Sequence, residues 1–180
     1  MISEQFVKDN STINENVDVK LLRSTIWDCQ RDYIKPILGT DLYDKVITDI
    51  TAGTLSGNYK ILADEYISES LLKWVMMESV PTMLYKYRNK AVSTQDSDNS
   101  QPISYTAMRE EMNRWRDKAE LRSEDITNYL RANDNLFPEY LSNSDEDDIY
   151  PNDNNYTTSI FLGNEINRQE ASHLFKCYKR

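Results

Sequence analysis

Hydrophobic residues recur at steps of three and four along most of the first 141 residues, which is the spacing of amphipathic helices. The clearest stripe follows Asp18, a favourable N-cap residue, and consists of Val19, Leu22, Ile26, Cys29, Tyr33 and Ile37. Pro36 lacks a backbone donor and Gly39 can take a left-handed conformation, so this helix should end near there. A short helix over Ser3 to Lys8 should precede it.

A second helix should follow at once. Thr40 is predicted to cap a helix over Asp41 to Thr51, whose apolar face consists of Leu42, Val46, Ile47 and Ile50. The polar and glycine-containing stretch Gly53 to Gly57 should form the loop that closes it.

The third predicted helix, over residues 58–90, is the most apolar in the chain. Its apolar residues occupy too much of the circumference for a one-sided surface helix, and include Leu62, Tyr66, Ile67, Leu71, Trp74, Val75 and Leu84. We therefore expect it at the centre of the bundle. Pro81 removes one internal hydrogen bond and should kink or split the helix, leaving Met83 to Lys90 tilted. A polar loop should cover Asp96 to Gln101.

A fourth, long helix is predicted to start at Ser104. Ile103 and Met108 would form a hydrophobic staple around this N-cap, and a second stripe runs to about Arg131 through Met112, Trp115, Ala119, Ile126 and Tyr129 or Leu130. Ser123-Glu124-Asp125 could restart the helix and break it. The sequence thus predicts an all-α domain over residues 1–141, a small bundle of about four main helices.

The composition changes after Leu141. Acidic and asparagine-rich sequence cannot bury enough apolar surface to offset the entropy of ordering, so residues 142–180 should form a flexible acidic arm. Within it, residues 156–162 are rich in strand formers and should make one short β-strand. Such a strand needs a partner sheet, and its candidate interaction residues are Tyr156, Thr158, Ile160, Phe161 and Leu162.

Charge narrows the classes of partner. Thirty acidic and twenty-one basic residues give a net charge of −9, which repels nucleic-acid phosphate and removes the main driving force of non-specific DNA binding. Acidity is compatible with a wall along which DNA slides, with a DNA mimic that occupies a basic partner, or simply with solubility.

Cysteine use and hydropathy point to a cytosolic origin. Cys29 and Cys177 lie far apart without a partner motif, so we expect two free thiols and neither a disulfide nor a zinc cluster. The longest apolar runs are only a few residues and no secretory leader opens the sequence, so we expect an intracellular product without a membrane span.

The usual chemical motifs are not found in the sequence. Four scattered glycines cannot form a phosphate loop, and the calcium-loop-like stretch from Asp96 has Gln101 where glycine is needed and Ala107 where glutamate is needed. His173 is the single histidine, and Cys29 lies on a core stripe. We therefore expect no catalytic residue, no cofactor and no metal, and so not an enzyme.

Glu78 interrupts an apolar stretch, and a buried carboxylate must find partners. A structural pairing or a subunit contact is favoured over acid chemistry. The aromatic residues could be read as base-stacking platforms, but helical spacing without interleaved basic residues favours core and interface positions.

Several stretches, by their order and spacing, resemble the small head-tail connector (neck adaptor) proteins of tailed phages, especially crAss-like phages and relatives that infect Bacteroidetes. The resemblance covers residues 2–141 and is carried by Ile26 to Gln30, Ile37 to Tyr43, Trp74 to Pro81, and Asn128 to Leu130 leading to Phe137 to Tyr140. The family's usual glycine after the third helix is not found at Asn89 to Val92.

This resemblance implies a structural virion protein made in the host cytoplasm and located at the head-tail junction. Bundles would pack side by side into a ring, a dodecamer of about twelve subunits that matches the portal. The ring would join the portal vertex to other neck or tail proteins, and during DNA ejection the genome would pass without sequence-specific binding. The rival hypothesis is a small acidic phage effector, a DNA mimic that inhibits a nucleic-acid-binding host protein.

Overall fold

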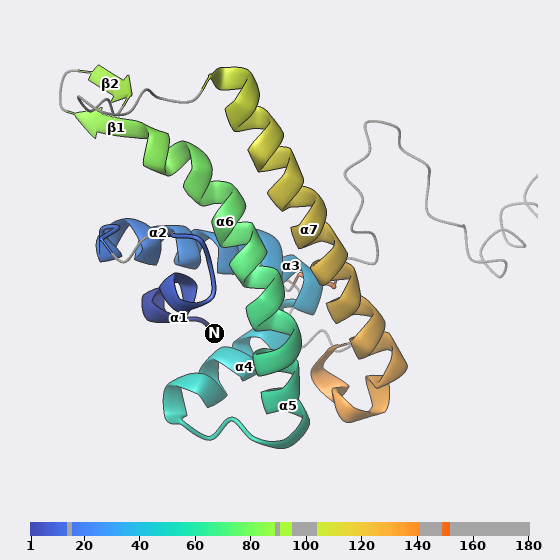
Figure 1. Ribbon diagram of the computed structural model, residues 1–180. Coiled ribbons are helices and arrows are strands. Elements are labelled where there is room, and N and C mark those ends of the chain that lie inside the picture. The colour runs from blue at the N-terminus through green and yellow to red at the C-terminus, as the bar shows by residue number, and fades with distance from the viewer. Residues whose placement is uncertain (14–15, 89–90, 95–103, 141–148, 152–180) are drawn as a thin grey trace, which may run out of the picture.

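The computed structural model shows a mostly helical bundle (Figure 1). It describes residues 1–13, 16–88, 91–94, 104–140 and 149–151. For the described residues within 84–103 it gives the backbone alone. The helical elements are α1 (Glu4–Asp9), α2 (Val19–Cys29), the π-helical turn η1 (Gln30–Ile34), α3 (Lys35–Leu38), α4 (Thr40–Ala52), α5 (Gly57–Ile61), a second π-helical turn η2 (Leu62–Ile67), α6 (Ser68–Leu84), α7 (Tyr105–Ala132), and the 3-10 turns η3 (Asp134–Leu136) and η4 (Pro138–Tyr140). The prediction of a helical bundle is confirmed.

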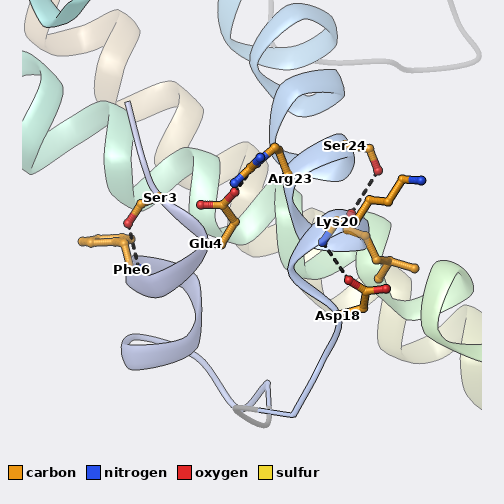
Figure 2. Close-up of polar contacts among 8 residues, drawn as sticks. Ser3, Glu4, Phe6, Asp18, Lys20, Arg23 and Ser24 are labelled. Atoms are coloured by element: carbon orange, nitrogen blue, oxygen red, sulfur yellow. Dashed lines mark hydrogen bonds and ion pairs between the residues drawn. The ribbon is translucent and has the colours of Figure 1, made fainter.

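The first two helices are capped at their N-termini by side chains, the second at the predicted Asp18 and the first at Ser3, which was predicted as its first residue. Ser3 accepts a hydrogen bond from the backbone N–H of Phe6 at 3.1 Å, and Asp18 accepts one from Lys20 at 2.9 Å (Figure 2). Arg23 of α2 donates to the Glu4 carboxylate of α1, and this hydrogen bond is the main reason why the pKa of Glu4 is lowered. The pair fastens the short N-terminal helix to the bundle.

Pro36 lies inside the first long helical segment, which runs through α2, η1 and α3. The backbone N–H of Lys35 donates to the carbonyl of Gln30, five residues back, so the wider turn comes directly before the proline. A wider turn accommodates the missing proline donor without ending the helix. The segment ends at Gly39 as predicted, with φ 77° and ψ 166°, a glycine-only conformation instead of the left-handed helical one.

Helix α4 corrects one detail of the sequence prediction. Its N-cap is Gly39, and Thr40 is the first helical residue, so the predicted Thr40 cap is wrong. The hydroxyl of Thr40 accepts a hydrogen bond from the backbone of Ile149 instead. At the other end, Gly53 caps α4 in the left-handed conformation, with φ 69° and ψ 22°.

The third helical segment runs unbroken from α5 through η2 to the end of α6, with Pro81 inside α6. The chain then enters the antiparallel hairpin of β1 (Tyr85–Arg88) and β2 (Ala91–Thr94), so the predicted tilted helix over Met83 to Lys90 is wrong from Tyr85 onwards. Alternating tyrosines and cations in β1, and β-branched residues in β2, favour strand over helix once the two segments pair. The register pairs Tyr85 with Thr94.

Helix α7 is continuous over 28 residues. Ser104 accepts a hydrogen bond from the backbone of Ala107, which confirms the predicted N-cap, whereas Ile103 and the predicted 96–101 loop lie outside the described residues. The break considered at Ser123 does not occur. Ser123 is 2% exposed and hydrogen-bonds Ser70 Oγ at 2.9 Å and Trp74 Nε1 at 3.0 Å, so its hydroxyl joins α7 to α6.

The core lies where α6 packs against α7 on one side and α2 on the other. Its largest fully buried side chains are Phe137, Leu22, Ile34, Leu38, Leu42, Leu62, Ile67, Leu71, Ile126 and Leu130. The central position predicted for the third helix is therefore correct. Along the described residues, no helix has both the length and the apolar content needed to cross a bilayer.

Tyr59 of α5 contacts the chain that follows α7, and this contact should make the stability of the fold depend on pH. Tyr59 packs edge-on against Phe137 and donates to Glu139 at 2.6 Å; burial first, then this hydrogen bond, raises its pKa to about 12. A pKa raised in the folded state stabilises the fold at lower pH, and that contribution fades as pH rises from about 10 to 12. We therefore expect the free energy of unfolding, measured by urea titration, to fall less steeply between about pH 10 and 12 in Tyr59→Phe than in the wild type. An unchanged slope would contradict the assignment.

Candidate interaction surfaces

The corner between α3 and α4 holds a segment from far along the chain. The backbone N–H of Thr40 donates to the carbonyl of Ile149 at 3.0 Å, and the N–H of Ile149 donates to Thr40 Oγ1 at 2.9 Å. Pro151 covers Gly39 so closely that a Cβ on Gly39 would lie 2.9 Å from both Cγ and Cδ of the proline. We call Gly39, Thr40, Ile149, Tyr150 and Pro151 the corner contact.

The corner contact places residues 149–151, which belong to the predicted arm, against the helical bundle. Composition placed the boundary at residue 141, yet residues 149–151 still touch the helical bundle. Tyr150 is 58% exposed and Ile149 48%, so the fastened segment presents apolar surface outward. The signal was present in the sequence, because Ile149-Tyr150-Pro151 interrupts an acidic and asparagine-rich stretch. The predicted arm strand, with Tyr156, Thr158, Ile160, Phe161 and Leu162, lies outside the described residues.

A groove of about 360 Å³ lies between α2 and α6, and Glu78 lines it. Tyr33 stacks on Trp74 with ring centroids 3.9 Å apart and donates to Glu78 at 2.6 Å. Burial, reinforced by the Glu78 hydrogen bond, raises the pKa of Tyr33 well above its usual value. Glu78 thus has the structural partner that its apolar neighbours predicted, and among the described residues no carboxylate, histidine or cysteine cluster is arranged to hold a metal.

Cys29 lies at the edge of this groove with its side chain fully buried. Burial raises the pKa of its thiol far above the usual value, so the reactive thiolate is scarce. In a Cys177→Ser variant, we expect a thiol reagent at pH 8 to leave Cys29 unmodified until denaturant is added, and then to modify one thiol per chain. Rapid modification of the folded variant would contradict the buried, inert assignment. The unfolded and unreduced wild type should give two free thiols.

A second hollow, about 450 Å³, opens between η2, α6 and α7. Its lining is mostly acidic and consists of Asp64, Glu65, Tyr66, Glu69, Arg122 and Asp125. Arg122 is already paired, 3.4 Å from Glu69 and 2.8 Å from Asp125. The hollow is therefore a negatively charged depression whose internal cation is neutralised by its own neighbours.

Helices α6 and α7 extend beyond the other helices and carry the β1–β2 hairpin at their tip (Figure 1). Tyr105 at the start of α7 is 65% exposed, and Trp27 on the outer face of α2 is 58% exposed beneath the guanidinium of Arg31. Neither residue belongs to an apolar stripe that the sequence periodicity predicted. Both are aromatic residues of the kind that dominate protein interfaces.

The matched family region includes three of the five residues of the corner contact, Gly39, Thr40 and Ile149. The chain matches the family of unknown function DUF6712 over residues 34–149, and it therefore belongs to that family. This span begins just before α3 and ends at Ile149, whose backbone pairs with Thr40 at the start of α4. No curated protein and no solved structure gives a significant match.

Proposed function

We propose that this chain is a subunit of a head-tail connector ring in a tailed phage, a structural virion protein that joins the portal vertex to the tail. The corner contact is the observation that carries the proposal. Ile37 to Tyr43, a stretch that resembles connector proteins, is where the C-terminal segment is fastened. A fixed departure point suits an arm that must reach a neighbouring subunit or neck protein in a defined direction.

Exposed aromatic and aliphatic side chains support side-by-side assembly. Trp27, Tyr105, Leu121 and Tyr150 are each more than half exposed, and they lie on α2, at the start of α7, in the middle of α7 and at the corner. Single exposed apolar residues are common on monomers, so the support comes from their spread over α2, two positions on α7 and the corner. A ring subunit needs at least two different contact faces, because its interfaces are head-to-tail.

The charge of the chain supports a channel that does not hold DNA. With a net charge of −9, the surface offers little to phosphate, and a genome could pass along it without being retained. The passage would be independent of sequence, since reading a base requires groove contacts that a repelling wall does not make.

Native mass spectrometry of the purified chain, with and without portal protein, tests this function. We expect a ring of about twelve subunits, either alone or once portal is added. A monomer that ignores portal would contradict the proposal. A monomer or dimer that instead captures a basic nucleic-acid-binding protein would support the DNA-mimic hypothesis.

The arm gives a separate prediction. Residues 156–162 should join a partner sheet on assembly, with main-chain hydrogen bonds supplying affinity and alternate side chains such as Tyr156, Thr158, Ile160 and Leu162 facing one side. Truncation after Asn155 should leave the thermal stability of the subunit within about 0.5 kcal/mol and abolish ring or particle assembly. Hydrogen exchange should show protection of this stretch only in the assembly. Unfolding of the truncated chain, or equal protection in the free subunit, would contradict the prediction.

A further inference from the structure

A cluster of cations surrounds one tryptophan on the outer face of α6 and α7. The Nζ of Lys118 lies 4.5 Å from the centroid of the Trp115 ring, the guanidinium carbon of Arg114 lies 5.4 Å away, and the Nζ of Lys73 lies 5.9 Å away. Lys73 comes from α6 and the others from α7, so the cluster spans both helices. We call these four residues the Trp115 patch.

The patch is short of counter-ions although the chain is acidic. Arg114 pairs with Glu111 at 3.1 Å, but within the described residues neither Lys73 nor Lys118 has a carboxylate within 4.0 Å. Three cations around one ring repel one another, and each cation–π contact at a surface returns only about 0.5–1 kcal/mol. An anionic occupant would relieve that repulsion, and the half-buried indole would add apolar contact area.

The longest unbroken acidic run in the chain is Asp145-Glu146-Asp147-Asp148. It directly precedes Ile149 in the sequence, and the backbone of Ile149 is hydrogen-bonded to Thr40. Its four carboxylates complement the charge of the Trp115 patch. Arginine and lysine donate strong, charge-assisted hydrogen bonds to carboxylates.

The position of the patch favours a neighbouring copy as the source of that run. Ala119, Ser123 and Ile126 mark the side of α7 that faces the bundle, and α3, which leads into the corner, packs against α7. Lys118 and Arg114 are exposed, and Lys118 lies about 100° around the helix from Ala119. The patch therefore faces outward, where a second subunit can reach it.

We infer that the Trp115 patch is the docking site for the acidic run Asp145–Asp148 of a neighbouring copy of this chain. The inference deepens the proposed ring and rests on it, because it supplies one subunit-to-subunit contact. The contact is largely electrostatic, so it weakens as salt rises.

Zero-length crosslinking of an isotope mixture tests the contact directly. Equal amounts of ¹⁵N-labelled and unlabelled full-length chains are mixed under conditions where native mass spectrometry shows oligomers, with portal if assembly needs it. Carbodiimide then couples lysine amines to carboxylates that touch them. We expect Lys73 and Lys118 to be linked to the 145–148 run, with about half of these links joining one labelled and one unlabelled chain, the statistical share for contacts between subunits.

Two charge reversals on α7 provide the matched comparison. Lys118→Glu should lower the yield of patch-to-run links at least about tenfold, including those made by Lys73. Arg116→Glu makes the same charge change two residues earlier, at a residue that faces Glu120 at 3.9 Å, and should leave the yield within about twofold. Equal losses in the two variants would mean that net charge, not the patch, drives association, and would overturn the inference.

Other outcomes separate this inference from the proposed function. Patch-to-run links found only within single isotopic chains would place the run on its own subunit and overturn the inference. Mixed-isotope links confined to other surfaces, or patch links to portal alone, would overturn the inference while leaving the ring intact. An absence of any mixed-isotope link, together with no complex with portal, would overturn both.

Discussion

Replacing Trp74 with alanine should lower the free energy of unfolding by about 3–5 kcal/mol, the usual cost of removing a buried tryptophan. Trp74 is 7% exposed, stacks on Tyr33 with an interplanar angle of 4°, and donates its indole N–H to Ser123. Its loss would open a cavity where η1, α6 and α7 meet and would leave the Ser123 hydroxyl without one of its two side-chain partners.

Trp27→Ala is the matched control, because it removes the same side chain from an exposed position on α2. Its cost should stay within about 1 kcal/mol, which covers the loss of the stacked Arg31 contact. Urea denaturation followed by circular dichroism measures both variants. Similar costs for the two tryptophans would contradict the account of the core.

Gly39→Ala should have the second large effect, costing about 1–3 kcal/mol from the backbone alone, since φ 77° with ψ 166° is accessible essentially only to glycine. A further cost comes from Pro151, because the new Cβ would lie 2.9 Å from two of its ring atoms. Gly53→Ala is the control, since it has positive φ but no neighbour within 4 Å of the added Cβ. It should cost only about 1–2 kcal/mol.

A double substitution separates the two costs at Gly39. Pro151→Ala removes the overlapping Cγ and Cδ atoms, so Gly39→Ala should be less destabilising in that background than in the wild type. Hydrogen exchange at the Ile149 amide, which donates to Thr40 Oγ1, should accelerate in Gly39→Ala and stay slow in Gly53→Ala. Unchanged protection in Gly39→Ala would show that Pro151 and Gly39 are not tightly coupled.

Local sequence signals predicted the helical elements well, because their caps and stripes act over only a few residues. Ser3, Asp18 and Ser104 each accept the backbone hydrogen bond expected of an N-cap. The stripe from Leu22 to Ile37 is buried at most of its predicted positions. Such signals depend on the period of one helix and need no knowledge of its partners.

The features that sequence missed depend on contacts between distant segments. The strand at Tyr85 forms because it pairs with Ala91 to Thr94, whereas the apolar stripe before it favoured a continued helix. Thr40 looked like a cap because nothing nearby in sequence revealed that Ile149 would use its hydroxyl. The wider turn before Pro36 was likewise hidden, since a proline alone signals a helix end.

We proposed above that this chain is a stoichiometric part of the virion neck. Quantitative mass spectrometry of purified tailed-phage particles whose genome carries the gene for this chain tests this proposal most directly. The account predicts the chain in intact virions at about the copy number of the portal protein, close to one subunit per portal subunit, and retained when particles are separated from infected-cell extract by density. Its absence from such particles, with the chain found only in the soluble extract, would contradict the connector function.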